Sequence, residues 1–241
     1  MAGHNKWSKV KHKKGVADAK KSKVWTKIIR EITVAAKLGG TDPSGNPRLR
    51  KALDDARINN LSKEPIQRAL AKATGKEDAA DYEELTYEGY GPGGVAILVS
   101  CLTDNRNRSY SEVRAAFHKN GGNLGTPGSV AFAFHKKGQI LIDKQENPNL
   151  SDEMLLVWGL DAGLEEIQDE SEGFVLFSAP ELLIHLKDAI EHQGVFVASS
   201  EIEMMAESPV SLSEENSHAL QKIVDLLEDL DDVQKVWTNE A

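Results

Sequence analysis

The residues best suited to binding chemistry lie at the start of the chain, where basic side chains surround one tryptophan. The neighbours of Trp7 that carry this character are Lys6, Lys9, Lys11, His12, Lys13 and Lys14. Ammonium groups neutralise phosphates and an indole ring stacks on a base, so the combination is typical of a segment that binds nucleic acid. A solvated basic tail is the competing interpretation, but an aromatic ring so early in a polar segment has no evident core to join.

Further cations extend this candidate surface. The additional candidate contacts are Lys20, Lys21, Lys23, Lys27, Arg30, Arg106 and Arg108. The last two stand in the polar stretch Asn105-Arg-Asn-Arg108, which reads equally well as a helix-start loop. A guanidinium offers forked donors that match phosphate oxygens, so we expect these arginines to extend the basic surface.

The charge is distributed unevenly along the chain. Residues 1–80 hold 19 Lys and Arg against 8 Asp and Glu, whereas residues 81–241 hold 10 against 30, which together give the net charge of −9. A polyanion is attracted to the first region and repelled by the second. The acidic region also leaves open a different hypothesis, that of a scaffold whose acidic domains bind a basic protein.

Catalytic and metal-binding patterns are missing from the sequence. The histidines are scattered, no phosphate-binding or nucleophile motif is present, and Cys101 is the only cysteine. We therefore expect a protein that is not an enzyme, has no metal, cofactor or small-molecule substrate, and resides in a reducing cytoplasm. No apolar run is long enough to cross a bilayer, so no membrane partner is expected.

Two glycine clusters have structural and functional interpretations. Gly89–Gly94 precedes a strand rather than a helix, so it lacks the helix N-terminus that binds phosphate and is expected to be a turn. Gly121–Gly128 links a helix to a strand and is longer than that connection requires. We favour a structural turn here too, with a binding loop as the alternative.

Apolar periodicity predicts the elements that position the basic residues. Residues 1–21 show no sustained period and are expected to form a mobile arm. From Ser22, apolar residues recur at spacings of three and four until Gly39-Gly40, which predicts a helix. Similar patterns predict helices over 47–60 and 62–75. Residues 1–80 should thus be a basic arm and a three-helix domain.

The pattern changes to short strands beyond Ala79–Glu84. Residues 138–205 read as a βαββαβ unit of ferredoxin-like plan, preceded by a separate strand over Ser129–His135. The remaining segments are 81–137 and 206–241, the latter including a βαβ fragment that begins with a strand over Met205–Leu212. The predicted fold class is α+β: an N-terminal three-helix domain followed by two α/β (ferredoxin-like) domains, one (138–205) inserted in the other (81–137 plus 206–241).

Several long motifs resemble one known family. They are Met1–Lys14 (MAGHNKWSKVKHKK), Tyr87–Gly94 (YEGYGPGG), Thr103–Arg108 (TDNRNR), Gly122–Gly125 (GNLG) and Gly128–Val130 (GSV). These resemble the YebC family of transcriptional regulatory proteins, which includes the mitochondrial translational activator of cytochrome oxidase subunit one. The resemblance spans most of the chain and implies a helical first domain, two α/β domains and no enzymatic activity.

The resemblance leaves the nucleic-acid target open. Members of the family are described both as DNA-binding transcriptional regulators and as factors that act on the translating ribosome. Residues 47–60 and 62–75 form no convincing helix-turn-helix signature, whereas a basic flexible end suffices to bind structured RNA. We expect a nucleic-acid-binding regulator of gene expression, with DNA as the first target and ribosomal RNA, on the ribosome, as the alternative.

Overall fold

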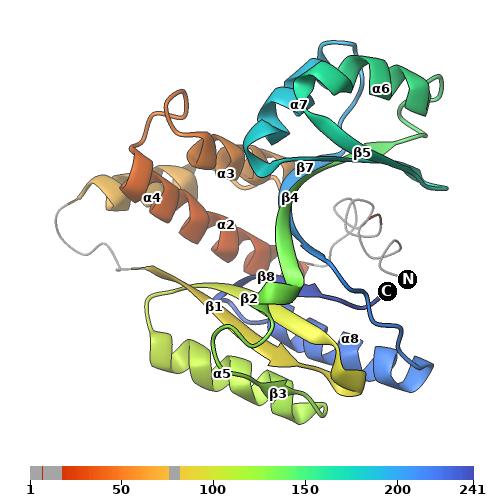
Figure 1. Cartoon of the computed structure of the whole chain (residues 1–241). Coiled ribbons are helices and arrows are strands. Elements are labelled where there is room, and N and C mark those ends of the chain that lie inside the picture. Colours follow the sequence, from red (N-terminus) through yellow and green to blue (C-terminus); the bar gives the residue numbers. More distant parts are fainter. Residues whose placement is uncertain (1–6, 8–17, 76–81) are drawn as a thin grey trace. The chain divides into compact units, whose positions relative to one another are not determined.

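Figure 1 shows the computed structural model of the chain, which describes residue 7, residues 18–75 and residues 82–241. Residues 1–6 and 8–17 of the expected arm therefore lie outside the described residues. The described residues form two compact units. One contains Trp7 and Phe132–Pro209. The other contains residues 18–75, residues 82–131 and Val210–Ala241. The chain thus leaves the second unit before Phe132 and returns to it at Val210.

Three helices follow the arm, as predicted. They are α2 (Asp18–Gly39), α3 (Pro47–Ile58) and α4 (Lys63–Thr74). Helix α2 begins four residues before the predicted Ser22. The turn into α3 is held by Asn46, whose amide donates to the carbonyls of Ala35 at 2.7 Å and Gly40 at 2.8 Å. The side-chain oxygen of Asn46 also accepts the Leu49 amide at 3.0 Å, so one residue ends the turn and caps the next helix.

The predicted periodic positions form the core of this helical region. Its fully buried members include Ile32, Ala35, Leu49, Ala52, Ala56 and Ala69. Alanine at the contact positions lets the helices approach closely. The indole of Trp25 adds a polar contact. Its Nε1 donates to the carbonyl of Asn59, the residue after α3, at a distance of 2.9 Å.

The first sheet in the chain belongs to the same unit as the helices. Its strands are β1 (Glu83–Tyr90), β2 (Ala96–Thr103), β3 (Asn123–Leu124) and β8 (Val233–Thr238), in the antiparallel order β3-β1-β2-β8. Helices α5 (Arg106–Lys119) and α8 (Glu214–Glu228) bury their apolar sides against one face of β2. Strand β8 follows the inserted region in the chain yet pairs with the central strand β2. The predicted insertion of one α/β domain into another is therefore confirmed.

The inserted sheet has the predicted βαββαβ order. Its elements are β4 (Phe134–Asp143), α6 (Asp152–Gly159), β5 (Leu164–Asp169), β6 (Gly173–Ser178), α7 (Leu183–Glu191) and β7 (Ser199–Ala206). Short 3₁₀ turns lie at Ala131–Ala133, Leu160–Ala162 and Pro180–Leu182. The strand order β5-β6-β4-β7 is that of a ferredoxin-like sheet, and every pairing is antiparallel.

Two strand predictions at the edges of this domain are wrong. The separate strand over Ser129–His135 is absent, because a 3₁₀ turn at Ala131–Ala133 leads directly into β4. The strand expected over Met205–Leu212 is also absent, since β7 ends at Ala206 and the following segment makes only an isolated bridge from Val210 to Glu240. Apolar residues alternate there, but Phe132 is 74% exposed, so the alternation does not distinguish a strand from a turn.

Both faces of the inserted sheet are apolar. Ile140, Ile142 and Leu176 face the helices α6 and α7. Their neighbours on the other face form a separate buried cluster of Leu141, Val175, Phe177 and Trp7, with Met205 partly buried against it. A sheet that is apolar on both faces needs a cover on each, and Trp7 supplies part of the second cover.

Candidate nucleic-acid interface

Most of the basic residues predicted from the arm have no described position. Those outside the described residues are Lys6, Lys9, Lys11, His12, Lys13 and Lys14. Lys20 lies in α2, where the structure describes the backbone only, and Lys21 is exposed on the same helix. The roles of these residues stay predictions.

Trp7 occupies an interior position. Its ring is 2% exposed, and its Nε1 donates to a carboxylate oxygen of Glu170 at 2.6 Å. A Cβ added to Gly173 would lie 2.3 Å from the indole, so the ring lies directly on the backbone of β6. The expectation that Trp7 has no core to join is therefore wrong, and in this arrangement the ring presents no face to a base.

The cations of α2 contact the C-terminal end of α8. Lys27 donates to the Glu228 carbonyl at 2.7 Å, and Lys23 lies 3.1 Å from the Asp229 carboxylate. Burial lowers the pKa of Lys27, although neighbouring acidic groups oppose this shift. Carbonyl groups at a helix C-terminus attract cations, so these lysines help to hold α2 against α8. They were predicted to bind phosphate, but the structure gives them partners within the chain.

A buried carboxylate, Asp232, collects the two arginines that were also predicted as phosphate contacts. The side chain of Asp232 is 2% exposed and accepts from Arg30 at 2.5 Å and from Arg108 at 2.8 Å. It also accepts from the hydroxyls of Thr103 at 3.0 Å and Ser109 at 2.6 Å. We call these five residues the Asp232 cluster. The cluster joins α2, the end of β2, the start of α5 and the loop before β8.

The charge state of Asp232 follows from these contacts. Burial alone would raise the pKa of its carboxyl, but hydrogen bonds from Ser109, Arg108 and Thr103 and the charge of Arg30 outweigh burial. The pKa therefore lies below its ordinary value, and the group is ionised at neutral pH. Arg30 and Arg108 are thus structural residues in this arrangement rather than free phosphate ligands.

Arg106 differs from Arg108 although only one residue separates them. Its side chain is 66% exposed, and its nearest carboxylate, that of Glu83, is 3.9 Å away. Arg106 lines a hollow of about 330 Å³ together with Tyr87, Tyr110 and Gly125. Arg106 is the more exposed of the two arginines in the polar stretch, and it lines this hollow while Arg108 is bound to Asp232.

The glycine-rich segment over Gly121–Gly128 is anchored beside this hollow by Glu88. The buried carboxylate of Glu88 accepts the amides of Gly128 and Val130 at 2.7 Å and that of Ala131 at 2.8 Å. Burial alone would raise the pKa of Glu88, but the three amides hold it below its ordinary value. The segment is therefore an ordered loop, and Gly125 contributes backbone to the hollow.

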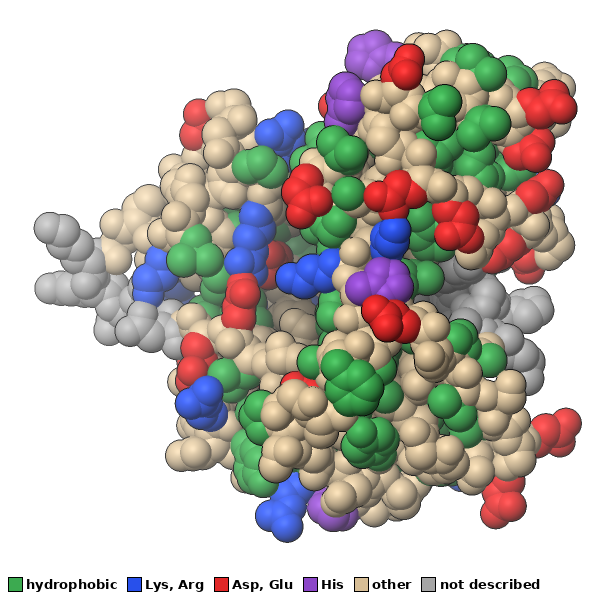
Figure 2. All heavy atoms as spheres, in the orientation of Figure 1, with side chains coloured by type: hydrophobic (Ala, Val, Ile, Leu, Met, Phe, Trp, Pro, Cys, Tyr) green, Lys and Arg blue, Asp and Glu red, His purple; other side chains and the backbone are tan. Residues whose placement is uncertain are grey.

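The sequence interpretation overlooked exposed cations on α3 and α4. The exposed basic residues of these helices are Arg50, Lys51, Arg57, Lys63, Arg68 and Lys72. Arg50 and Arg57 are seven residues apart and therefore share one side of α3, while Arg68 and Lys72 are four apart and share one side of α4. Figure 2 shows Lys and Arg side chains over this helical region. The excess of cations in residues 21–75, twelve against five Asp and Glu, was the signal that could have identified them.

Other chemistries find little support among the described residues. Burial raises the pKa of the Cys101 thiol to about 12, so the thiolate nucleophile does not form at neutral pH. The described ranges contain no group of three His, Cys, Asp or Glu side chains placed to hold a metal ion. Within those same ranges, every helix is too short or too polar to cross a membrane.

Comparison with known proteins identifies relatives over nearly the whole chain. The model of the TACO1/YebC protein N-terminal domain matches residues 5–76, and that of the TACO1/YebC second and third domain matches residues 82–240. A "Probable transcriptional regulatory protein" of Geobacter sulfurreducens is 49% identical over 99% of this chain and 95% of its own length. One of the same description from Carboxydothermus hydrogenoformans is 48% identical over 99% of this chain and 98% of its own.

A solved structure has the same fold. The crystal structure of a conserved hypothetical protein from Aquifex aeolicus superposes with a TM-score of 0.82 at 41% identity, covering 93% of this chain and 91% of that one. The resemblance drawn from the sequence motifs and the predicted fold class are both confirmed.

Proposed function

Because this chain belongs to the TACO1/YebC family, we propose that it is a nucleic-acid-binding regulator of gene expression, with DNA as the first expected target. The names of relatives that match nearly the entire chain support a role in transcription. The observation that carries the proposal is the set of exposed cations on α3 and α4. Arg57 and Arg68 pair with Asp54 at 3.2 Å and Glu64 at 3.3 Å, but these pairs are exposed, and an exposed pair contributes little free energy. Lys27 and Arg30 of α2 instead contact partners at the end of α8 and in the loop before β8.

We expect the triple substitution of Arg57, Arg68 and Lys72 by glutamine to weaken binding to duplex DNA and to reduce its salt dependence. Each lost phosphate contact should lower the slope of log affinity against log salt by about 0.7 to 0.9, because fewer counterions are released. Fluorescence anisotropy over a salt series measures this slope. Lys222→Gln, at an exposed position of α8, is the matched control and should leave the slope unchanged. A triple variant with the slope of the control would remove α3 and α4 from the interface.

The arm lysines form a second set for the same measurement. Substituting Lys6, Lys9, Lys13 and Lys14 by glutamine tests them without removing the nearby tryptophan. Deleting the arm would also remove Trp7 from the inserted domain, so a loss of binding after deletion would have two explanations.

Crosslinking in cells, followed by sequencing of the bound DNA and RNA, distinguishes the two targets. Enrichment of promoter DNA supports the transcriptional role. Enrichment of ribosomal RNA instead supports a translation factor that binds the ribosome, and the aromatic hollow near Arg106 favours this alternative because unpaired bases stack on aromatic rings.

A second candidate function, binding of a basic protein by the acidic inserted domain, is favoured by one surface. Residues 134–206 hold 15 Asp and Glu against 4 Lys and Arg. A hollow of about 310 Å³ between α6 and β5 is lined by Leu156 and Leu160 and by acidic side chains including Glu165 and Asp169. Val157 beside it is 75% exposed, and Figure 2 shows hydrophobic and acidic side chains together on this domain. An apolar patch with an acidic rim suits a basic, apolar protein segment.

Site-specific photocrosslinking in cells tests this second function. A benzophenone amino acid at Val157 is expected to yield a discrete adduct with a basic protein, identified by mass spectrometry. The same probe at the exposed Gln221 of α8 is the control. Equal, diffuse labelling from both positions would argue against a docking surface on α6.

A further inference from the structure

We propose that the hollow lined by Tyr87, Arg106, Tyr110 and Gly125 binds one unpaired nucleotide of a single-stranded nucleic acid, and this inference rests on the proposed function. Three sequence motifs that are separate in the chain meet at this hollow. Tyr87 comes from β1, Arg106 and Tyr110 from α5, and Gly125 from the glycine-rich loop. The residues that line the hollow come from β1, α5 and the glycine-rich loop, so the local structure of one turn does not account for them.

The two tyrosines supply a stacking surface. Their ring centroids are 6.3 Å apart and the rings are inclined by 52°, so Tyr87 supports Tyr110 from the side. The hydroxyl of Tyr87 donates to the Arg106 carbonyl at 3.4 Å, which links its ring to the start of α5. Tyr110 remains 45% exposed, so part of its apolar ring is accessible to a ligand. A base stacked on Tyr110 would cover that ring.

The start of α5 supplies a phosphate site next to these rings. The amides of the first helical turn have no partner within a helix and point outward, which favours an anion. Asn105 caps the helix by accepting the Arg108 amide at 3.0 Å, while Arg106 and Asn107 line the hollow. The Arg106 guanidinium can approach two phosphate oxygens at once. A nucleotide can therefore place its base on Tyr110 and its phosphate at Arg106.

Nearby carboxylates do not cancel this positive site. Glu88 lines the hollow, but its charge is taken up by three backbone amides. Asp104 is paired with Arg108 at 2.8 Å. Glu83 is 3.9 Å from Arg106, and an exposed pair at that distance contributes little free energy. A phosphate can thus replace Glu83 as the partner of Arg106.

The size of the hollow suits one nucleotide. Its volume of about 330 Å³ lies at the lower end of the range for small-molecule sites. A paired base inside a duplex has both faces covered by its neighbours, so only an unpaired base can stack on Tyr110. Stacking on a ring tolerates every base, and we expect weak sequence preference.

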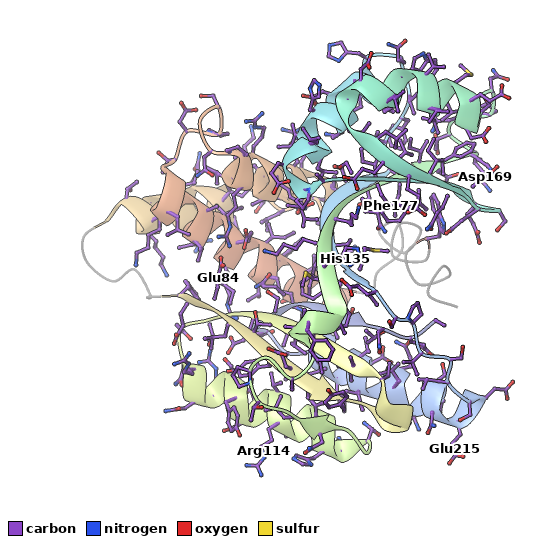
Figure 3. The ribbon with its side chains drawn as sticks, viewed as in Figure 1. Glu84, Arg114, His135, Asp169, Phe177 and Glu215 are labelled. Atoms are coloured by element: carbon purple, nitrogen blue, oxygen red, sulfur yellow. The ribbon has the colours of Figure 1, made fainter. Side chains whose placement is uncertain are left out.

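The test compares four variants on labelled single strands. Tyr110→Ala should weaken binding of fluorescein-labelled oligouridine about 5- to 150-fold, the equivalent of about 1 to 3 kcal/mol for one stacked base. Tyr110→Phe keeps the ring and should retain affinity. Arg106→Gln should weaken binding and lower its salt slope. Arg114→Gln is the matched control, because Arg114 is exposed further along α5 and projects away from the sheet in Figure 3.

The outcomes separate this site from the proposed function. If the wild-type protein binds neither duplex nor single strands, the proposed function itself fails. If it binds single strands and Tyr110→Ala and Arg106→Gln match Arg114→Gln, the hollow is not a nucleotide site and the proposed function stands. Oligouridine and the corresponding deoxyribose strand distinguish RNA from DNA as the source of the nucleotide. Loss of affinity for duplex DNA equal to that for single strands would also overturn the assignment.

Discussion

Replacing Asp232 with alanine is expected to lower the free energy of unfolding by about 3 to 5 kcal/mol, because two arginines would lose a shared buried partner. The carboxylate also accepts from Thr103 and Ser109, whose buried hydroxyls would be left without this acceptor. Urea denaturation followed by circular dichroism measures the change. The cluster joins the helical region to the first sheet, so we expect both to lose stability together.

A matched control separates the buried carboxylate from the surface acids around it. Asp229 lies three residues before Asp232 at the end of α8. It is exposed and pairs with Lys23 of α2 at 3.1 Å. Asp229→Asn should change the free energy of unfolding by about 0 to 1 kcal/mol, as exposed pairs do. Equal effects of Asp229→Asn and Asp232→Ala would contradict the structural role of the cluster.

The same carboxylate predicts a pH dependence. Because the pKa of Asp232 is lower in the folded protein than in the unfolded chain, its contribution to stability is fully present well above the ordinary aspartate pKa of about 3.9. This contribution is lost as the pH falls through the folded-state pKa. The stability difference between the wild type and Asp232→Asn should therefore shrink on acidification. A difference that grows as the pH falls would contradict the assignment.

Replacing Trp7 with alanine should destabilise the inserted domain by about 3 to 5 kcal/mol, the usual cost of removing a buried aromatic side chain. The variant would leave Leu141, Val175 and Phe177 without part of their cover and would remove the hydrogen bond to Glu170. Hydrogen exchange of the β4 and β6 amides measures the local effect.

Trp7→Phe is the control for this prediction. It preserves apolar burial but cannot donate to Glu170, so its loss of stability should be intermediate. The sequence interpretation, in which Trp7 stacks on a base, makes the opposite prediction. It requires Trp7→Ala to weaken nucleic-acid binding with no change in hydrogen exchange.

Local patterns explain why much of the fold was predictable. The spacing of Ile28 and Ile32 identified α2, and Pro47 marked the start of α3. The βαββαβ order followed from alternating strand and helix patterns, and the fragments left on either side of it predicted the insertion. Each of these inferences used residues within one element or the order of elements.

The partners of the charged residues were not predictable in the same way. Arg30 and Asp232 are 202 positions apart, and nothing local indicates that they meet. Sequence reasoning therefore counted Arg30 and Arg108 as free cations. The polar stretch was interpreted as a unit, yet Arg108 faces the buried carboxylate while Arg106 faces solvent. A helix turns by about 100° per residue, so two arginines separated by one position point in different directions.

Trp7 illustrates the same limit for apolar residues. A signal for its burial existed in strand β6, where the four consecutive apolar residues Phe174–Phe177 needed cover on both faces. The sequence did not say which distant segment would supply that cover. The hollow near Arg106 was not predicted, because Tyr87, Tyr110 and Gly125 belong to segments that are separate in the sequence.

The pairing of β8 with β2 also bears on how the protein is made. Synthesis proceeds from the N-terminus, and domains tend to fold as units while the chain emerges. The inserted sheet has all of its strands once Ala206 has emerged, whereas the first sheet must wait for Val233–Thr238. During that interval β2 lacks one neighbour and Asp232 is not yet present to bind Arg108. The later domain in the chain can therefore mature before the earlier one, and a stop before β8 would leave β2 as an unpaired edge of the earlier sheet.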